Sequence, residues 1–239
     1  VCRGLAEFQS DLGAHGNYYR PLSRQLYFEA LVPIGGWLPA VFHLFNFALF
    51  LGSLALLADL LRAKLPPTGV LAGVLYFAVI PFQRVNLMWI SCSQDLLALT
   101  ATLGALAPYR RSRMTPALVC FAAAVASKES ALALPIALPF WDRLLERREW
   151  PDAARRVASF AVVAIAWVTS SLVMRARHAA AAPLDVSLEA FAAGFVHLVQ
   201  SLVGTDHPAG WWQSMGEHGP ALLPLLCFAS AVLLIVEGG

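Results

Sequence analysis

Long stretches of this chain hold no charged residue. Residues 30–58, 65–83, 157–174 and 218–236 contain no Asp, Glu, Lys or Arg, and these runs are 29, 19, 18 and 19 residues long. The hydrocarbon core of a bilayer is about 30 Å thick, and an α-helix needs about 20 apolar residues to cross it. The pattern therefore predicts an all-α, polytopic transmembrane helical bundle.

We expect seven helical spans from this pattern. They are residues 38–61, 68–82, 87–108, 115–126, 130–141, 157–174 and 220–236. The fourth and fifth spans have 12 residues each, fewer than a full crossing needs. Such short segments rely on flanking residues or end in a protein-lined cavity, which is typical of transporters and intramembrane enzymes.

The basic residues between these spans fall into two alternating sets. The larger set has ten members: Arg62, Lys64, Arg110, Arg111, Arg113, Arg143, Arg147, Arg148, Arg155 and Arg156. The smaller set has seven, spread over longer segments: Arg3, Arg20, Arg24, Arg84, Lys128, Arg175 and Arg177. Short cytoplasmic loops carry an excess of Lys and Arg, so the first set is expected to be cytoplasmic. Residues 1–37 and 175–219 are then external.

Each external segment contains a stretch with apolar residues at helical spacing. Residues 21–31 and 188–204 are expected to form helices that lie in the membrane interface on the outer face. For residues 188–204 an eighth span remains the alternative. Val1 is not an initiator methionine, and the chain ends directly after an apolar run. We therefore expect residues 1–239 to form one transmembrane domain that is incomplete at both ends.

The composition agrees with a membrane protein and excludes other classes. Apolar residues make up 59% of the chain and charged residues 13%, against roughly 25% charged in soluble domains. The net charge is +2, and no basic run is flanked by aromatic residues, so no nucleic-acid partner is expected. Fifteen of the 17 basic residues are Arg and the chain is rich in Ala, which hints at a GC-rich bacterial gene and hence at a bacterial inner membrane.

The four cysteines form no CxxC pair and show no Cys/His spacing suited to zinc. They are Cys2, Cys92, Cys120 and Cys227. We expect free thiols.

Polar groups that interrupt the apolar runs are informative, because each costs several kcal/mol in a membrane unless it is paired or hydrated. The first group lies at residues 15–23, with Tyr19 and Arg20 before a proline and Asp11 just upstream. It suits an anion or a sugar, and an interfacial aromatic belt with a snorkelling arginine is the alternative. The second is His43 and Asn46, which share a helix face and suit an interhelical hydrogen bond.

The third group is residues 89–97, where Asp95 falls in the first turns of a predicted helix; a structural cap or a packed polar cluster is the alternative. The fourth is residues 127–130. Here Ser127 is expected to cap the following helix, and Lys128 is a positive charge among apolar neighbours that suits an anion. A neutralising pair with Glu129 or another carboxylate is the alternative. Three of the four groups fall on the predicted outer side, which indicates one site for a lipid phosphate with a polar head.

Four short motifs occur in order: YYRPLS (18–23), HLFN (43–46), WISCSQDLLA (89–98) and ASKESALALP (126–135). Together they resemble the GT-C class of polytopic glycosyltransferases, with bacterial relatives of the protein O-mannosyltransferases as the nearest group. The resemblance implies a polyprenyl-phosphate-linked sugar donor and inverting transfer on the extracytoplasmic side. The acceptor is a protein, a lipid or a glycan.

The resemblance also implies roles for individual residues. Arg20 and Lys128 are expected to contact the donor phosphate and Tyr19 the sugar or phosphate, while Asp95 and Glu129 orient the two cations. Asp11 is a weak candidate for the catalytic base, which is expected upstream of Val1. A divalent metal (Mg or Mn) is compatible with the class, although no ligand set here demands one. A transporter or flippase of a lipid-linked or anionic solute, and a non-catalytic truncated relative, remain alternatives.

Overall fold

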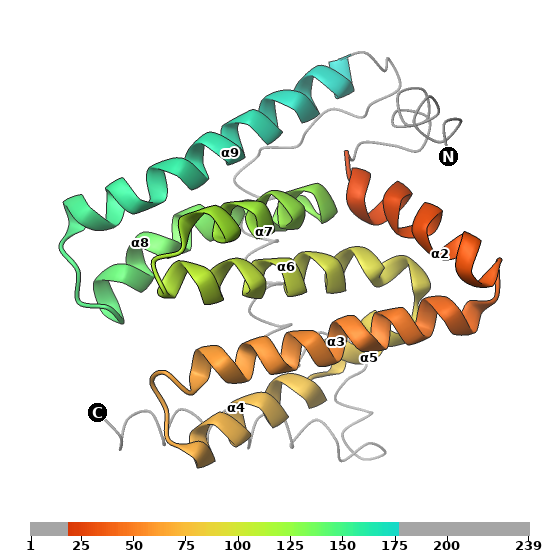
Figure 1. Ribbon diagram of the computed structural model, residues 1–239, viewed down its shortest axis with the longest axis horizontal. Helices are drawn as coiled ribbons and strands as arrows, with labels where there is room; N and C mark the ends of the chain where they lie inside the picture. The colour runs from red at the N-terminus through yellow and green to blue at the C-terminus, as the bar shows by residue number, and fades with distance from the viewer. Residues whose placement is uncertain (1–18, 177–239) are drawn as a thin grey trace, which may run out of the picture. The chain divides into compact units, whose positions relative to one another are not determined.

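The computed structural model describes residues 19–176, and every regular element in this range is a helix (Figure 1). The predicted all-α class is confirmed for this part of the chain. The described residues divide into two compact units: residues 19–53 with 90–176, and residues 54–89. Asp11, the interfacial segment 188–204 and the span 220–236 lie outside the described residues.

The first unit begins with two helices joined by a tight turn. A π-helical turn, η1 (Leu22–Leu26), continues into α2 (Tyr27–Gly35), and α3 (Pro39–Leu61) follows. Gly36 has φ 61°, which a glycine adopts without steric cost. Tyr27 Oη donates to Asn46 Oδ1 at 2.9 Å and thereby joins α2 to α3. Residues 21–35 are helical, which agrees with a helix over the expected 21–31, and Asn46 takes part in the expected interhelical hydrogen bond. That the helix lies in the membrane interface stays a prediction.

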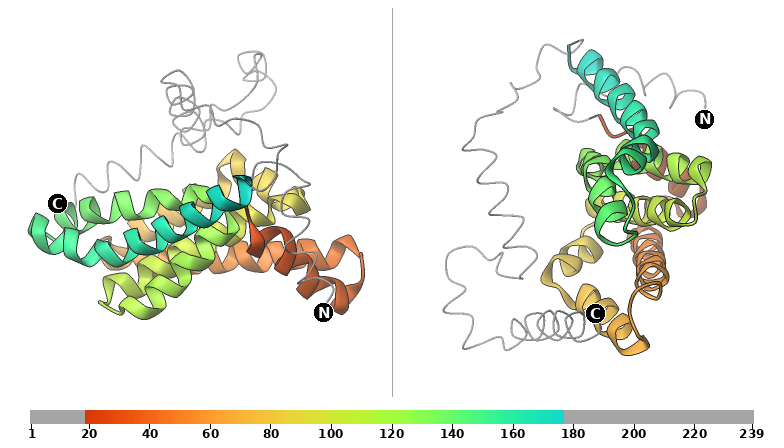
Figure 2. Two further views of the ribbon diagram at one scale, coloured as in Figure 1. Left: turned by 90° about the horizontal axis from the view of Figure 1, so that it is seen from above. Right: turned by 90° about the vertical axis from the view of Figure 1, so that its left-hand side faces the viewer.

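The centre of this unit is an antiparallel pair of helices (Figures 1 and 2). After a short 3₁₀ turn, η2 (Ile90–Cys92), come α6 (Ser93–Arg110) and α7 (Met114–Ser127). A second 3₁₀ turn, η3 (Glu129–Ala133), leads to α8 (Leu134–Leu144), and α9 (Trp150–Ala176) packs against α7 and α8. Tyr109, Phe121 and Phe160 are almost fully buried between these helices.

Because successive helices of this unit run in opposite directions, the connections between them lie at two opposite ends. The α6–α7 turn and the α8–α9 loop lie together at one end, and the junction of α7 with η3 lies at the other, beside η1 (Figure 1). Within this unit, the loops assigned to the cytoplasmic set are therefore at one end and Arg20 and Lys128 are at the opposite end.

The second unit contains the end of α3, then α4 (Pro67–Val79) and α5 (Pro81–Met88). A single helix over 68–82 was the wrong expectation. Ile80 has ψ 138°, outside the helical range, because the residue before a proline is disfavoured in a helix. Pro81 then begins α5, where its missing N–H is not needed.

Three helices of the described chain are long and apolar enough to cross a membrane: Pro39–Leu61, Ile90–Arg110 and Trp150–Met174. Large apolar side chains on them are exposed, as expected for contact with lipid, among them Leu44, Val162 and Ile165. These helices indicate an integral membrane protein. Two shorter apolar helices, Pro67–Val79 and Met114–Ser127, overlap the expected segments 68–82 and 115–126, and that they cross the membrane stays a prediction. Cys92 and Cys120 are free, as expected.

Candidate functional site

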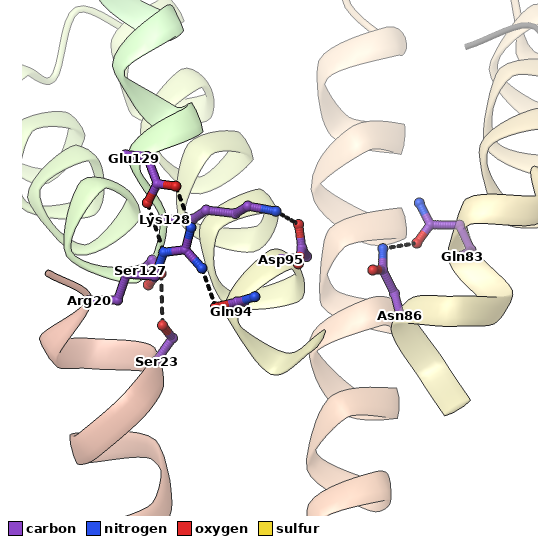
Figure 3. A network of polar contacts seen from close by, with 9 residues as sticks. All are labelled: Arg20, Ser23, Gln83, Asn86, Gln94, Asp95, Ser127, Lys128 and Glu129. Carbon is purple, nitrogen blue, oxygen red and sulfur yellow. Dashed lines mark hydrogen bonds and ion pairs between the residues drawn. The ribbon is translucent and has the colours of Figure 1, made fainter. Parts of the chain in front are cut away.

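Three separate segments meet at one end of the α6–α7 pair (Figure 3). Arg20 immediately precedes the turn η1, Gln94 and Asp95 lie in the first turn of α6, and Lys128 and Glu129 follow α7. Figure 3 shows the side chains of Arg20 and Lys128 directed at partners on different segments. Four of the five residues predicted for the donor site, Arg20, Asp95, Lys128 and Glu129, are thus gathered in one cluster.

Arg20 is fixed by three hydrogen bonds. Its Nε donates to Glu129 Oε2 at 2.7 Å, Nη2 donates to Glu129 Oε1, and Nη1 donates to Gln94 Oε1 at 2.6 Å. The pairing with Glu129 is the two-pronged geometry that a planar guanidinium favours with a carboxylate. Arg20 is only 6% exposed, so its position is set by the protein.

The same contacts act on the carboxyl group of Glu129. Burial alone would raise the pKa of Glu129, but the hydrogen bonds from Arg20, a backbone N–H and the charges of Arg20 and Lys128 together lower the pKa below its ordinary value. Glu129 is therefore ionised at neutral pH. It is suited to holding a cation and poorly suited to accepting a proton.

Lys128 forms an ion pair with Asp95 across the gap between α7 and α6. Of the two readings that the sequence allowed, the structure shows the neutralising pair, with Asp95 as the partner. The extended backbone of Lys128 (φ −157°, ψ 136°) interrupts the helix between α7 and η3. Its side chain is 26% exposed and that of Asp95 15%, so this pair is more accessible than the guanidinium of Arg20.

A further hydrogen bond holds η1 against the end of α7. Ser23 Oγ donates to the carbonyl oxygen of Ser127 at 2.7 Å, and both serines are buried. The hydroxyl of Ser127 itself donates back to Ala123 O at 2.8 Å. The expectation that Ser127 caps the following helix is therefore wrong, since its side chain is used within α7.

Tyr19 lies at the edge of the cluster and contacts α9. Its ring centroid is 6.5 Å from that of Trp167, with the planes inclined at 40°. Trp167 was not singled out in the sequence, because an aromatic residue inside an apolar run is indistinguishable from one that faces lipid. The structure thus adds α9 to the elements around the site.

A second charged cluster lies at the opposite end of the same helices and provides a comparison. Asp142 of α8 is completely buried and accepts hydrogen bonds from Tyr109 Oη at 2.6 Å and from Arg156 Nη1 at 2.8 Å. Arg148 Nε is 3.8 Å from the same carboxylate. Because no part of Asp142 is exposed and its oxygens are occupied, this cluster joins helices, whereas the accessible cluster around Lys128 is suited to a ligand.

Within residues 19–176, no three His, Cys, Asp or Glu side chains come together in a way that could hold a metal ion. Comparison of the chain with protein-family models, with curated proteins and with solved structures gave no match.

Proposed function

We propose that this chain is part of a membrane glycosyltransferase of the GT-C class, and that the Arg20–Lys128 cluster binds the phosphate of its donor. The donor is a polyprenyl-phosphate-linked sugar, transferred with inversion on the extracytoplasmic side of the bacterial inner membrane. The observation that supports this most is the cluster itself. Two cations, each held by its own carboxylate, meet at an accessible end of an otherwise apolar helix pair.

The charges of the cluster balance before any ligand arrives. Burying an unpaired cation in a membrane is costly, and the carboxylates of Glu129 and Asp95 remove most of that cost. Lys128 has three N–H donors and remains partly exposed, so it is the direct phosphate contact in our proposal. Arg20 is buried and fixed, and it contributes positive charge at a set position.

The depth of the cluster suits a lipid-linked ligand. Helix α7 has 14 residues and is therefore about 21 Å long, less than the hydrocarbon thickness of about 30 Å. If the arginine-rich turn before α7 lies at the cytoplasmic boundary, Lys128 lies at the outer boundary of a hydrocarbon layer that is thinned around this short helix. A phosphate attached to a membrane-embedded prenyl chain can reach that depth more readily than a soluble sugar phosphate.

The chemistry requires two kinds of assistance. A base takes the proton of the acceptor hydroxyl as that oxygen attacks the anomeric carbon, and the bond from this carbon to the phosphate oxygen breaks, leaving polyprenyl phosphate. General-base help contributes about 10²–10⁴ in rate, and fixed cations stabilise the charge on the leaving phosphate. Glu129 and Asp95 are engaged by cations, so the cluster stabilises the charge of the leaving phosphate and does not supply the base. The base is a separate residue, for which Asp11 stays a weak candidate.

Replacing Lys128 by Ala tests the proposal directly. In the complete protein reconstituted in vesicles, we expect K128A to lose transfer of radiolabelled sugar from a polyprenyl-phosphate hexose, while its amount in the membrane is unchanged. Lys64 is the other lysine of this chain and provides the matched control, K64A, which should retain activity. Transfer by K128A at the wild-type rate would contradict a phosphate contact.

Transport of a lipid-linked or anionic solute is the second candidate. The short helix α7 and the break between α4 and α5 favour it, because interrupted helices also form transport sites. The two functions differ in their product. A transporter would move a fluorescent lipid-linked donor across a vesicle membrane without releasing polyprenyl phosphate, whereas a transferase releases it.

A further inference from the structure

The end of the first unit that is opposite the Lys128 cluster has a concentrated positive charge. Residues 109–113 and 142–156 contain eight arginines against four acidic residues. Four exposed arginines among them form what we call the arginine face: Arg113, Arg143, Arg147 and Arg155. They come from the α6–α7 turn, from the end of α8 with the loop that follows it, and from the start of α9.

The buried Asp142 cluster brings these segments together. Arg156 of α9 donates from Nη1 to Asp142 of α8 at 2.8 Å and from Nη2 to the carbonyl oxygen of Tyr109 on α6 at 2.8 Å. The guanidinium of Arg156 also lies 4.2 Å from the centre of the Tyr109 ring. Three segments distant in the sequence are therefore held as one surface, with its exposed arginines at fixed relative positions.

The acidic residues of these segments leave the face with a net positive charge. Asp142 is completely buried and used by Arg156 and Arg148, so it offers no charge to the surface. Asp152 is 3.7 Å from Arg155, but both side chains are largely exposed, and such pairs contribute little. Glu146 and Arg111 have partners of their own, and the four arginines of the face outnumber the two exposed acidic residues, Glu149 and Asp152.

Apolar side chains accompany the charge. Trp150 is 51% exposed and Leu144 is 73% exposed beside the same loop. A tryptophan and a leucine next to exposed arginines are typical of a surface at the headgroup level of a bilayer, where the ring and the alkyl chain enter the lipid and the guanidinium groups meet phosphates.

The backbone of the loop offers a way to separate charge from folding. Arg147 has φ 55° and Ser112 in the α6–α7 turn has φ 57°, a left-handed conformation that is unfavourable for a residue with a side chain and that glycine adopts readily. A glycine at position 147 would therefore remove the charge without straining the backbone.

We propose that the arginine face binds the headgroups of anionic phospholipids on the cytoplasmic leaflet. A lipid surface fits this face for three reasons. The face is positively charged, exposed apolar side chains accompany the charge, and the face lies at one end of the α6–α7 pair. This proposal is independent of the sugar-transfer proposal, since it concerns the opposite end of the unit.

The test uses the full chain reconstituted in vesicles with equal phosphatidylglycerol and phosphatidylcholine, each carrying a photoactivatable group. We expect about fivefold or greater enrichment of phosphatidylglycerol among the cross-links at residues 109–113 and 142–156. The enrichment should weaken between about 0.1 M and 1 M salt, where the screening length falls from about 10 Å to about 3 Å. The triple variant R113Q/R143Q/R147Q should bring the ratio close to one. Arg84, an exposed arginine on α5, provides the control R84Q, which should leave the ratio unchanged.

R147G separates binding from folding, because it removes one charge and relieves the left-handed backbone. We expect it to melt no lower than wild type and still to lose part of the enrichment. Equal cross-linking of both lipids in wild type, or a ratio that the triple variant leaves unchanged, would overturn the proposal. Tighter binding of a single-stranded oligonucleotide than of phosphatidylglycerol vesicles would also overturn it and would assign the face to nucleic acid.

Discussion

Arg20 and Glu129 illustrate how a charged residue is accommodated in an apolar chain. The guanidinium is buried, two of its nitrogens bond the same carboxylate, and Gln94 accepts from a third. Removing the charge of Glu129 leaves the guanidinium without its ionic partner. We expect E129Q to lower stability by about 1–3 kcal/mol, because Gln offers the buried guanidinium one neutral acceptor oxygen in place of two charged ones. Thermal melting of the purified protein measures this, and Glu149, which is exposed, supplies the control E149Q.

The acid dependence of stability follows from the same residue. The pKa of Glu129 is lowered in the folded protein, so its contribution to stability is fully present above the unfolded-state value of about 4.3 and is lost as the pH falls through the lower folded value. We expect wild type to lose part of its stability below about pH 4.3 and E129Q to lack that component. Identical pH profiles of melting temperature for the two proteins between pH 7 and pH 3 would contradict the assignment.

The sequence identified the residues of this cluster but not all of their pairings. Arg20, Asp95, Lys128 and Glu129 were singled out because a charge in apolar surroundings needs an explanation. That Lys128 pairs with Asp95 and that Arg20 bonds Gln94 depends on how α6 and α7 pack, which the spacing of residues along the chain does not determine. Asp142 was not recognised, because at the end of an apolar run it looks like an ordinary loop charge.

At the scale of elements, Asp142 connects α6, α8 and α9. Its carboxylate is completely buried and receives Tyr109 and Arg156. Replacing Asp142 by Asn leaves Arg156 without a negative partner, and we expect a loss of about 3–5 kcal/mol, the cost of breaking a buried pair. Asp152 is the matched control, because its ion pair with Arg155 is exposed and D152N should change stability little. Chemical denaturation in detergent compares the two variants, and similar midpoints would contradict the role given to Asp142.

Helix ends were predictable where charge or proline marked them. The expected segments 38–61 and 115–126 match Pro39–Leu61 and Met114–Ser127 to within one residue. The segments 87–108 and 130–141 were placed less well. The first begins in the end of α5 and passes through the 3₁₀ turn η2 before α6, and the second begins in the 3₁₀ turn η3, and a hydropathy pattern does not distinguish such turns from α-helix. The break at Pro81 could have been found from the proline alone.

The topology inferred from the basic residues places the two ends of α7 on opposite sides of the membrane. Ser112 in the α6–α7 turn and Ser130 after α7 are both exposed and mark these ends. Cysteines introduced at the two positions, in a background without the four native cysteines, should react with a membrane-impermeant maleimide from opposite sides of sealed vesicles. Reaction of both from the same side would contradict the orientation inferred from the ten-to-seven division of basic residues.

The proposed contact between Lys128 and a lipid-linked phosphate can be tested directly, because the chain has only two lysines, Lys64 and Lys128. The reconstituted protein is treated with an amine-reactive acetylating reagent with and without polyprenyl phosphate, and acetylation of each lysine is quantified by peptide mass spectrometry. We predict that polyprenyl phosphate protects Lys128 and leaves Lys64 unchanged, and that the dephosphorylated polyprenol protects neither. Equal acetylation of Lys128 with and without polyprenyl phosphate would contradict the account.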